Sequence, residues 1–382
     1  MFKRLLESDD LEKRTCFLWG PRQTGKSTLL RSLFPGATYY NLLRSEEYAR
    51  LNQHPSLLRS EVLASVNRSG PVIVDEVQKI PPLLDEIHSL ISEYDIRFIL
   101  SGSSPRKLKR AGGNLLGGRA VRYQLFPLTS REIPSFDLGR ALNHGLLPTH
   151  YLSDDPRPLI DAYVGDYLEE EIAAEAQARR VPTFARFLHA AAFSNGSTVN
   201  VRNVALECGV SAPTAREYFQ ILEDTLLARF IPVYRTRPKR RVALSPIFYL
   251  FDVGLTNVLL KRGTVSPGSE SFGRAFEHFI FQEIVAHSAY TRGHPPVATW
   301  RTSSQLEVDF ILGEHETAVK CKAVPLGLPG HTKGLRAFRE EYPVKNSIVV
   351  TMDPRPRTEE GVRFLPWNVF LDELWGGLLT RG

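Results

Sequence analysis

GPRQTGKST (residues 20–28) decides how the first part of this chain folds, because it fits the spacing G-x-x-x-x-G-K-[ST]. A loop of this kind wraps backbone N–H groups around phosphate oxygens, and Gly25 permits the close approach. Lys26 then reaches the β- and γ-phosphates, and Ser27 offers its hydroxyl to magnesium. The helix that follows points the positive end of its dipole at the anion. The stretch predicts a nucleotide site formed by Arg22, Gln23, Thr24, Gly25, Lys26, Ser27 and Thr28.

Two adjacent carboxylates end a buried strand about fifty residues later, in VIVDEVQ (72–78). Carboxylates at such a position are costly unless they meet a cation or hydrogen-bond donors. We therefore expect Asp75 to hold the magnesium shell and Glu76 to orient or deprotonate the attacking water. The alternative is that both side chains only cap the next helix. The predicted cofactors are ATP and magnesium.

Three further residues are candidates for the same site. ILSGSS (99–104) ends the next strand, and Ser101 or Ser103 could hydrogen-bond the lytic water or the γ-phosphate. An ordinary polar turn explains these serines equally well. Arg119 in GGRAVR is a candidate transition-state arginine, acting in cis or in trans, and a solvated or structural arginine is its alternative.

Short apolar runs alternate with helical patterns from residue 15 to 128. Nearly continuous apolar strands are typical of parallel sheets covered on both faces. The alternation predicts an α/β, doubly wound domain. The expected strands are TCFLWG (15–20), TYYNLL (38–43), PVIVDEV (71–77), RFILSGS (97–103) and AVRYQLF (120–126).

The pattern changes from about residue 155. Residues 158–228 have helical periodicity without a convincing strand, and 198–230 reads as a helix-turn-helix followed by a basic turn and a strand in 235–252, as in a winged helix. From 272 a helix, three strands within 297–324 and further elements predict a small α/β domain. The expected domains are 1–155, 156–250 and 251–382.

Composition excludes several classes of protein. The 382 residues are 24% charged and 42% hydrophobic, which is typical of globular domains. Cys16, Cys208 and Cys321 have no disulfide or zinc spacing. The N-terminus lacks the apolar core of a secretory signal, and no stretch reaches the roughly 18 apolar residues of a membrane span. We expect a soluble cytoplasmic protein that does not interact with membranes.

Several of these motifs occur together, and in the same order, in one known group of proteins. The motifs are distributed over nearly the whole chain. They are GPRQTGKS, VIVDEVQKIP, ILSGSS and LLGGRAVRYQLFPLT, followed by GVSAPTAREYFQILEDT, IFYLFDVGL and FEHFIFQEI. The chain resembles bacterial and archaeal ATPases of the AAA+ superfamily that carry a C-terminal domain of unknown function. The resemblance implies a P-loop AAA+ core, a winged helix and a fold similar to restriction nucleases.

One position departs from the nuclease pattern. Such a nuclease places an acid on a helix, an Asp on one strand and an acid-x-Lys pair on the next. Glu277, Asp309 and Lys322 match three of these positions, but Lys320 stands at the remaining acidic one. Its charge opposes a hard cation, which needs carboxylate oxygens. Glu307, on the face of Asp309, is a weaker alternative ligand, so we expect an inactive nuclease-like domain.

Basic residues cluster at the expected wing, at Arg235, Arg237, Lys239, Arg240 and Arg241. The segment 198–246 has eight Lys/Arg and four Asp/Glu, so it carries four of the chain's six net positive charges. This charge suits phosphate contacts to double-stranded DNA through the winged helix and the basic turn 235–241. A solvated turn or a protein-binding surface is the alternative. Helix 211–225 offers few base-reading side chains, so sequence-specific reading is not expected.

The sequence thus predicts a Mg-ATP-hydrolysing AAA+ switch whose nucleotide state positions a winged helix and a nuclease-like domain. An alternative is a slowly hydrolysing, ATP-loaded scaffold that binds a protein or nucleic acid. A nucleotide-gated nuclease is a third reading, which Lys320 opposes. Assembly into a homo-oligomer, in which Arg119 would act in trans, is left open.

Overall fold

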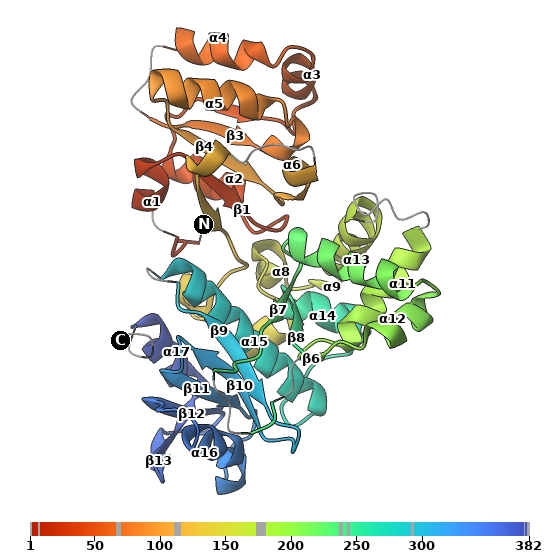
Figure 1. Cartoon of the computed structure of the whole chain (residues 1–382), viewed down its shortest axis with the longest axis vertical. Coiled ribbons are helices and arrows are strands. Elements are labelled where there is room, and N and C mark those ends of the chain that lie inside the picture. The colour runs from red at the N-terminus through yellow and green to blue at the C-terminus, as the bar shows by residue number, and fades with distance from the viewer. Residues whose placement is uncertain are drawn as a thin grey trace. The chain divides into compact units, whose positions relative to one another are not determined.

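The computed structural model describes residues 2–6, 8–65, 70–110, 116–172, 181–236, 240–242, 245–291, 294–377 and 379 (Figure 1). The chain divides into two compact units, one of residues 1–128 with 224–227 and one of 129–223 with 228–382. The first unit ends at Leu128, because the next helix, α7 Leu138–His144, packs against α14 Val253–Leu259 and α15 Glu270–Tyr290 of the second unit. The expected domain boundary at 155 stays a prediction. A further boundary near residue 250 stays a prediction.

The first unit is built on a five-stranded parallel sheet, as the sequence predicts. The strand order is β2-β3-β4-β1-β5, so the strand before the phosphate loop lies between β4 and β5. The strands are β1 Cys16–Trp19, β2 Tyr39–Asn41, β3 Val72–Asp75, β4 Phe98–Gly102 and β5 Val121–Gln124. All five occur within the predicted runs.

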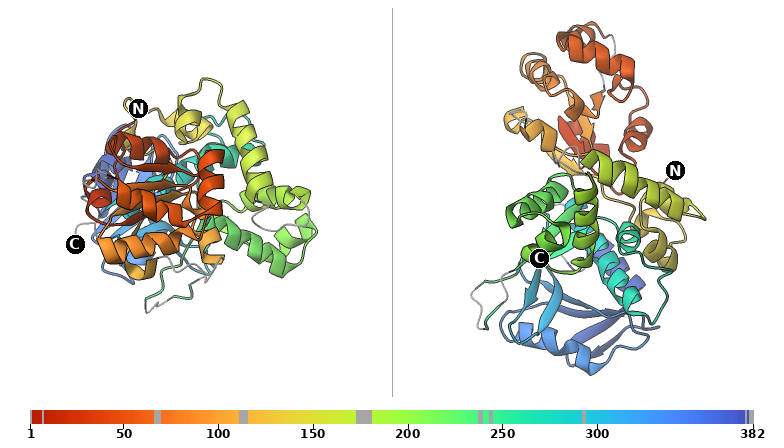
Figure 2. Two further views of the ribbon diagram at one scale, coloured as in Figure 1. Left: turned by 90° about the horizontal axis from the view of Figure 1, so that it is seen from above. Right: turned by 90° about the vertical axis from the view of Figure 1, so that its right-hand side faces the viewer.

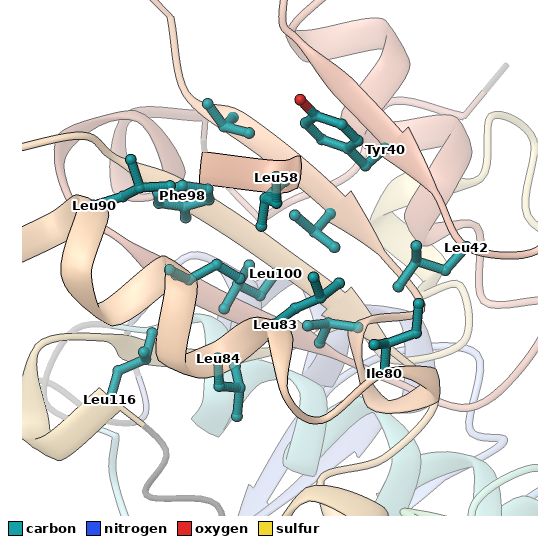
Figure 3. Close-up of a cluster of buried hydrophobic side chains, with 14 of the residues drawn as sticks. Tyr40, Leu42, Leu58, Ile80, Leu83, Leu84, Leu90, Phe98, Leu100 and Leu116 are labelled. Atoms are coloured by element: carbon teal, nitrogen blue, oxygen red, sulfur yellow. The ribbon is translucent and has the colours of Figure 1, made fainter. Parts of the chain in front are cut away.

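Strand alternation divides this sheet into two buried faces. Trp19, Val74 and Leu100 belong to one hydrophobic cluster, which side chains of α3, α4 and α5 complete. Figure 3 shows Leu100 together with Leu58 of α4 and Leu84 of α5. Their neighbours Leu18 and Ile73 are also buried but face the other side, where α2 lies (Figure 1). The helices are α1 Ser8–Lys13, α2 Lys26–Leu33, α3 Ser45–Gln53, α4 Ser56–Ala64, α5 Leu83–Tyr94 and α6 Arg106–Arg110, with short 3-10 helices η1 Val77–Lys79 and η2 Leu116–Gly118.

The second unit begins with a largely helical region. Two helices, α12 Val201–Cys208 and α13 Ala212–Asp224, occupy the predicted helix-turn-helix. Gly209 has φ 66° in the turn, and Ser211 Oγ accepts from Thr214 N at 3.2 Å. A small antiparallel sheet of order β6-β8-β7 flanks them, since β6 precedes α12 whereas β7 and β8 follow α13, and its shortest strand, β6, lies where no strand was expected. The elements are η3 Ser130–Glu132, α7 Leu138–His144, α8 Pro148–Leu152, α9 Arg157–Ala162, a π-helix η4 Tyr163–Ile172, α11 Val181–Phe193, β6 Ser197–Thr198, β7 Ala228–Ile231, β8 Ile247–Leu250 and α14 Val253–Leu259.

A six-stranded mixed sheet of order β13-β14-β12-β11-β10-β9 forms the rest of this unit. The long helix α15 packs on β9 and β11, and α16 packs on β10 and β11 (Figure 2). The predicted helices and strands are present, and β13 and β14 are additional. The elements are α15 Glu270–Tyr290, β9 Val297–Arg301, β10 Glu307–Leu312, β11 Thr317–Cys321, η5 Pro329–Thr332, α16 Lys333–Arg339, β12 Asn346–Thr351, β13 Arg357–Glu359, β14 Val362–Pro366 and α17 Trp367–Trp375.

Two properties expected from composition can be examined in the described residues. All three cysteines are buried free thiols. Among the helices that the structure describes, none combines the length and apolar character that crossing a membrane requires.

Two helical glycines differ in the space around them. A Cβ at Gly334 in α16 would lie 1.9 Å from the Glu307 carbonyl oxygen, whereas a Cβ at Gly273 in α15 would meet nothing within 4 Å. We expect Gly334→Ala to lower the free energy of unfolding by roughly 1–3 kcal/mol, since backbone must move. Gly273→Ala should raise it by roughly 0.5–1 kcal/mol, because alanine favours helix.

Urea unfolding of both variants measures these changes. Since both substitutions improve helix propensity alike, opposite signs isolate the close packing of α16 on β10. Equal stabilisation in both variants would contradict the packing described here.

Candidate functional site

The phosphate loop connects β1 to α2 and owes its shape to glycines and local hydrogen bonds. Gly25 has φ 93°, a left-handed conformation that favours glycine. A Cβ at Gly20 would lie 2.4 Å from the carbonyl oxygen of Leu125, so this position also requires glycine. Arg4 Nη1 donates to the Thr24 carbonyl at 2.6 Å, and Thr24 Oγ1 donates to the Pro21 carbonyl at 2.9 Å. The loop is therefore held from within and from the N-terminal segment.

Lys26 is the first residue of α2, and its ammonium group lies inside the loop. Nζ donates to the carbonyl oxygens of Gly20 at 2.6 Å and Pro21 at 3.1 Å. Burial lowers the pKa of Lys26, and the neighbouring Glu76 and Asp75 carboxylates oppose that change. The loop thus holds a buried cation beside two acidic side chains, at the position where the sequence predicts phosphates.

The Asp75 carboxylate joins three elements at the end of β3. Its Oδ2 accepts from Ser27 Oγ and from Tyr39 OH, both at 2.6 Å, and its Oδ1 accepts from Ser101 Oγ. Strand alternation places Tyr39, Asp75 and Ser101 on the α2 face, because Tyr40, Val74 and Leu100 belong to the opposite cluster. Serine hydroxyl and carboxylate oxygens are hard ligands of the kind that magnesium prefers. Ser27 and Asp75 therefore fit the magnesium role predicted for them.

Tyr39 is a site residue that was not predicted. Burial, together with its hydrogen bond to Asp75, raises the pKa of this phenol, so it stays a donor. The signal lay in TYYNLL (38–43), where alternation requires one of two adjacent tyrosines to face α2.

Glu76 follows Asp75 directly, at the point where β3 ends. It adopts a left-handed conformation with φ 62° and ψ 41°, after which η1 begins. Its Oε2 accepts from Gln78 Nε2 at 2.5 Å, and the same nitrogen donates to Ser103 Oγ at 3.1 Å. The expected partners Glu76 and Ser103 are thus connected through Gln78, a residue that the sequence analysis did not consider.

The remaining candidate residues do not all lie near the phosphate loop. Arg119 precedes β5, whose first residue Val121 pairs with Cys16, the first residue of β1. This is the sheet edge opposite the phosphate loop, and Arg119 Nη1 contacts His88 Nε2 at 3.0 Å. A role for Arg119 in cis is therefore not supported by its position, and a role in trans stays a prediction. Arg22, Gln23 and Thr28 lie in the loop and the first turn of α2, as predicted.

In the second unit, Lys320 pairs with the carboxylates that a nuclease-like site would use. Its Nζ lies 2.6 Å from both Glu307 Oε1 and Asp309 Oδ1, and Asp309 Oδ2 accepts from Cys321 N at 2.7 Å. Burial by itself would lower the pKa of Lys320, but the neighbouring carboxylates of Asp309 and Glu307 raise it above its usual range. Among the described residues, no three His, Cys, Asp or Glu side chains are arranged to hold a metal ion. Lys322 makes no comparable ion pair within the described part of the chain.

The third acid, Glu277, has a different partner. Tyr249 OH donates to Glu277 Oε1 at 2.7 Å. Burial raises the pKa of Glu277 to about 7, the Asp309 carboxylate adds to the rise, and the hydrogen bond from Tyr249 opposes it. The buried acid is stabilised by a neutral donor, whereas Glu307 and Asp309 are stabilised by a cation.

The basic turn is partly committed to contacts within its own unit. Arg240 donates to the Ala337 carbonyl at 2.9 Å and to Glu341 Oε1 at 2.8 Å, and it also pairs with Glu340. Arg235 and Arg241 are exposed, and Arg237 and Lys239 lie outside the described residues. Arg240 therefore has a structural role beside α16, and its side chain is not free to contact a phosphate.

Comparison with known protein families divides the chain into three parts. Residues 12–134 match a family described as AAA domain. Residues 135–266 and 272–370 match two domains of unknown function, DUF8612 and DUF4143 respectively. The first match contains the phosphate loop, β3 and β4, so this part of the chain is similar to an AAA domain.

Similar proteins occur in bacteria. Uncharacterized proteins of Mycobacterium bovis and Mycobacterium tuberculosis are each 27% identical over 300 residues, which is 77% of this chain and 66% of the relative. The chain thus spans just under two thirds of their length. An uncharacterized protein of Haemophilus influenzae is 21% identical over 322 residues, covering 76% of this chain and 78% of that protein. Among solved structures, the Walker-type ATPase PABY2304 of Pyrococcus abyssi has a TM-score of 0.42 and 16% identity, over 64% of this chain and 90% of that one.

The raised pKa of Glu277 predicts how the stability of this region depends on pH. The pKa of this carboxyl is about 7 in the folded protein and 4.5 ordinarily. Its contribution to the free energy of unfolding is therefore fully present below about pH 4.5 and is lost as the pH rises through 7. Glu277→Gln keeps an oxygen for Tyr249 without acquiring charge. We expect the variant to gain stability over wild type between pH 4.5 and 8, by on the order of 1–3 kcal/mol.

Urea unfolding at a series of pH values gives this difference directly. The comparison isolates Glu277, because His278 and His287, whose pKa values burial lowers to about 4, titrate in both proteins. Glu270→Gln, at an exposed carboxylate on the same helix, should show no pH-dependent gain. A constant difference between wild type and Glu277→Gln would refute the assignment.

Proposed function

We propose that this protein binds and hydrolyses Mg-ATP as an AAA+ ATPase and acts as a nucleotide-dependent switch. The observation that carries the proposal is the convergence of Lys26, Ser27 and Asp75 at one edge of the parallel sheet. Ser27 and Asp75 approach within 2.6 Å from different elements, and Lys26 is buried beside them. Such an arrangement of hydroxyl, carboxylate and ammonium suits a nucleotide phosphate with its metal ion.

Each residue of the site has a separate task in the proposal. The loop N–H groups and Lys26 hold the phosphates, and Ser27 and Asp75 hold magnesium, which when bound supplies positive charge to the phosphate oxygens. Glu76 accepts a proton from the attacking water or orients it. Ser101 supports Asp75 through their hydrogen bond, and Ser103 lies at the end of β4 within reach of the group that Glu76 contacts.

Two other proposals concern the second unit. The helices α12 and α13 with the sheet β6-β8-β7 have the order of a winged helix, and exposed Arg235 and Arg241 favour phosphate contacts with duplex DNA. The β9–β12 region with α15 would be a nuclease-like domain that has lost its activity. Binding of DNA, homo-oligomer formation and a slow ATP-loaded scaffold remain proposals beside the ATPase.

Hydrolysis is tested by variants that separate binding from chemistry. Lys26→Ala should lose both nucleotide binding and turnover, because it removes the charge that faces the phosphates. Glu76→Gln should still bind ATP but turn over about 100-fold more slowly or worse, since a general base contributes roughly 10²–10⁴-fold. Phosphate release and equilibrium ATP binding are the two measurements.

Glu93→Gln is the matched control, because Glu93 is an exposed carboxylate at the far end of α5. Its turnover should equal that of wild type. If Glu76→Gln hydrolyses ATP as fast as wild type, Glu76 is not the base. Repeating the assay with duplex DNA distinguishes a DNA-linked switch, whose turnover changes, from a scaffold, whose turnover stays slow.

The proposal that the nuclease-like domain is inactive rests on the ammonium group of Lys320. We expect no cleavage of plasmid, linear or single-stranded DNA or of RNA with Mg²⁺ or Mn²⁺, with or without ATP, because Lys320 neutralises Glu307 and Asp309. Lys320→Glu should bind Mn²⁺ more tightly than wild type, as titration calorimetry would show.

Lys320→Met is the control for this variant, since it removes the ammonium without adding a ligand. It should lose stability, by at most the roughly 3–5 kcal/mol of breaking a fully buried pair, because Asp309 is left buried without a cation whereas Glu307 is 43% exposed. Cleavage by wild type that disappears in Asp309→Ala would overturn the proposal.

A further inference from the structure

Gln78 connects two residues of the proposed ATPase site that the sequence keeps 27 positions apart. Gln78 is the second residue of η1, two positions after the left-handed residue Glu76, and is only 5% exposed. Nε2 donates to Glu76 Oε2 at 2.5 Å and to Ser103 Oγ at 3.1 Å. Glu76 and Ser103 are each 7% exposed, so all three groups interact away from bulk water.

The chemistry of the three side chains fixes the orientation of the carboxamide. An amide nitrogen has two hydrogens, and here two oxygen acceptors use them. The reversed orientation would place the amide oxygen against the Glu76 carboxylate, where no proton is available between the two acceptors. The observed donor therefore follows from the charge of Glu76.

Gly102 provides the space that the carboxamide occupies. A Cβ at Gly102 would lie 2.1 Å from Gln78 Oε1 and 2.6 Å from the Trp19 ring, so any larger residue would displace one of them. Gln78 Oε1 accepts no hydrogen bond from the described residues. The glutamine is thus held by packing on one side and by its two acceptors on the other.

We propose that Gln78 is a positioning residue, which holds the carboxylate of Glu76 in a fixed relation to the hydroxyl of Ser103 at the end of β4. This inference rests on the proposed function, because a base needs positioning only if the site hydrolyses ATP. The left-handed backbone at Glu76 leaves the direction of its side chain to local contacts, and Gln78 is the donor that sets this direction. A change at Ser103 is thereby transmitted to the base through one side chain.

Removing the carboxamide should slow the chemical step without weakening nucleotide binding. Gln78→Leu keeps a similar volume but donates no hydrogen bond, so Glu76 becomes free to leave its position. We expect kcat to fall roughly 10- to 100-fold, as for small misplacements of catalytic groups, with KM changed less than about 3-fold. Gln78→Asn, which retains a shorter donor, should recover part of kcat.

Two measurements separate positioning of the base from a merely structural role. In the Glu76→Gln background, Gln78→Leu should cause no further loss of kcat, because there is no base left to position. In Gln78→Glu, a second carboxylate beside Glu76 should raise the pKa values of the pair. The acidic limb of the kcat–pH profile should therefore move to higher pH.

The full-length protein is assayed with Mg-ATP, and urea unfolding verifies that each variant is folded. Thr15→Val is the matched control, since Thr15 Oγ1 accepts from Phe98 N at 3.0 Å at the opposite end of β4. It loses a buried hydrogen bond but should keep the wild-type kcat. If wild type hydrolyses no more ATP than Lys26→Ala, the proposed function itself fails.

If wild type hydrolyses ATP, the outcomes bear on Gln78 alone. A lower kcat with unchanged KM, no further loss in the double variant and a shifted acidic limb support positioning. Equal kcat in Gln78→Leu and wild type, an additive loss in the double variant, or an unmoved acidic limb in Gln78→Glu would each overturn it.

Discussion

The first unit depends on a carboxylate that ends a buried strand. Asp75 is 1% exposed, and an acidic group at such a place is tolerated only with donors around it. Ser27, Tyr39 and Ser101 supply hydroxyl groups from α2, β2 and β4. The hydrogen bonds that Asp75 requires thus connect α2, the helix after the phosphate loop, to the neighbouring strands β2, β3 and β4. The same oxygen atoms form the proposed magnesium site, so structure and proposed function share one set of contacts.

In the second unit, carboxylates are also stabilised by neighbouring side chains, but most of that stabilisation comes from a cation. Glu307 and Asp309 meet the ammonium of Lys320 at 2.6 Å, and Glu277 meets the hydroxyl of Tyr249. A cation held covalently by the chain cannot leave or exchange, whereas hydroxyl groups leave carboxylate oxygens able to accept another ligand. This difference explains why acids in the first unit favour a metal role and those in the second favour a structural one.

The sequence predicted the elements whose signals are local. The five strands of the first sheet follow from apolar runs, and the phosphate loop follows from its glycine spacing and from Lys26 and Ser27. Gln78 and Tyr39 were missed because their importance depends on which strand face or turn brings them to Asp75 and Glu76. Arg119 follows a segment that resembles a known motif, yet the register of β5 places it at the far edge of the sheet. Composition does not determine strand register or the conformation of a turn, so the sequence could not show which face or end of the sheet these residues occupy.

The backbone at Glu76 shows how two adjacent carboxylates can be given different tasks. In a regular strand, Asp75 and Glu76 would face opposite sides of the sheet, and Glu76 would enter the hydrophobic cluster with Val74. The left-handed conformation ends the strand at that residue and places Val77 in the cluster instead. Glu76 then remains at the sheet edge, where a single glutamine meets it. A strained residue costs stability, and it persists here because the contacts on either side of it leave no regular alternative. Glu76 is thus the residue at which the buried strand ends and the proposed catalytic site begins.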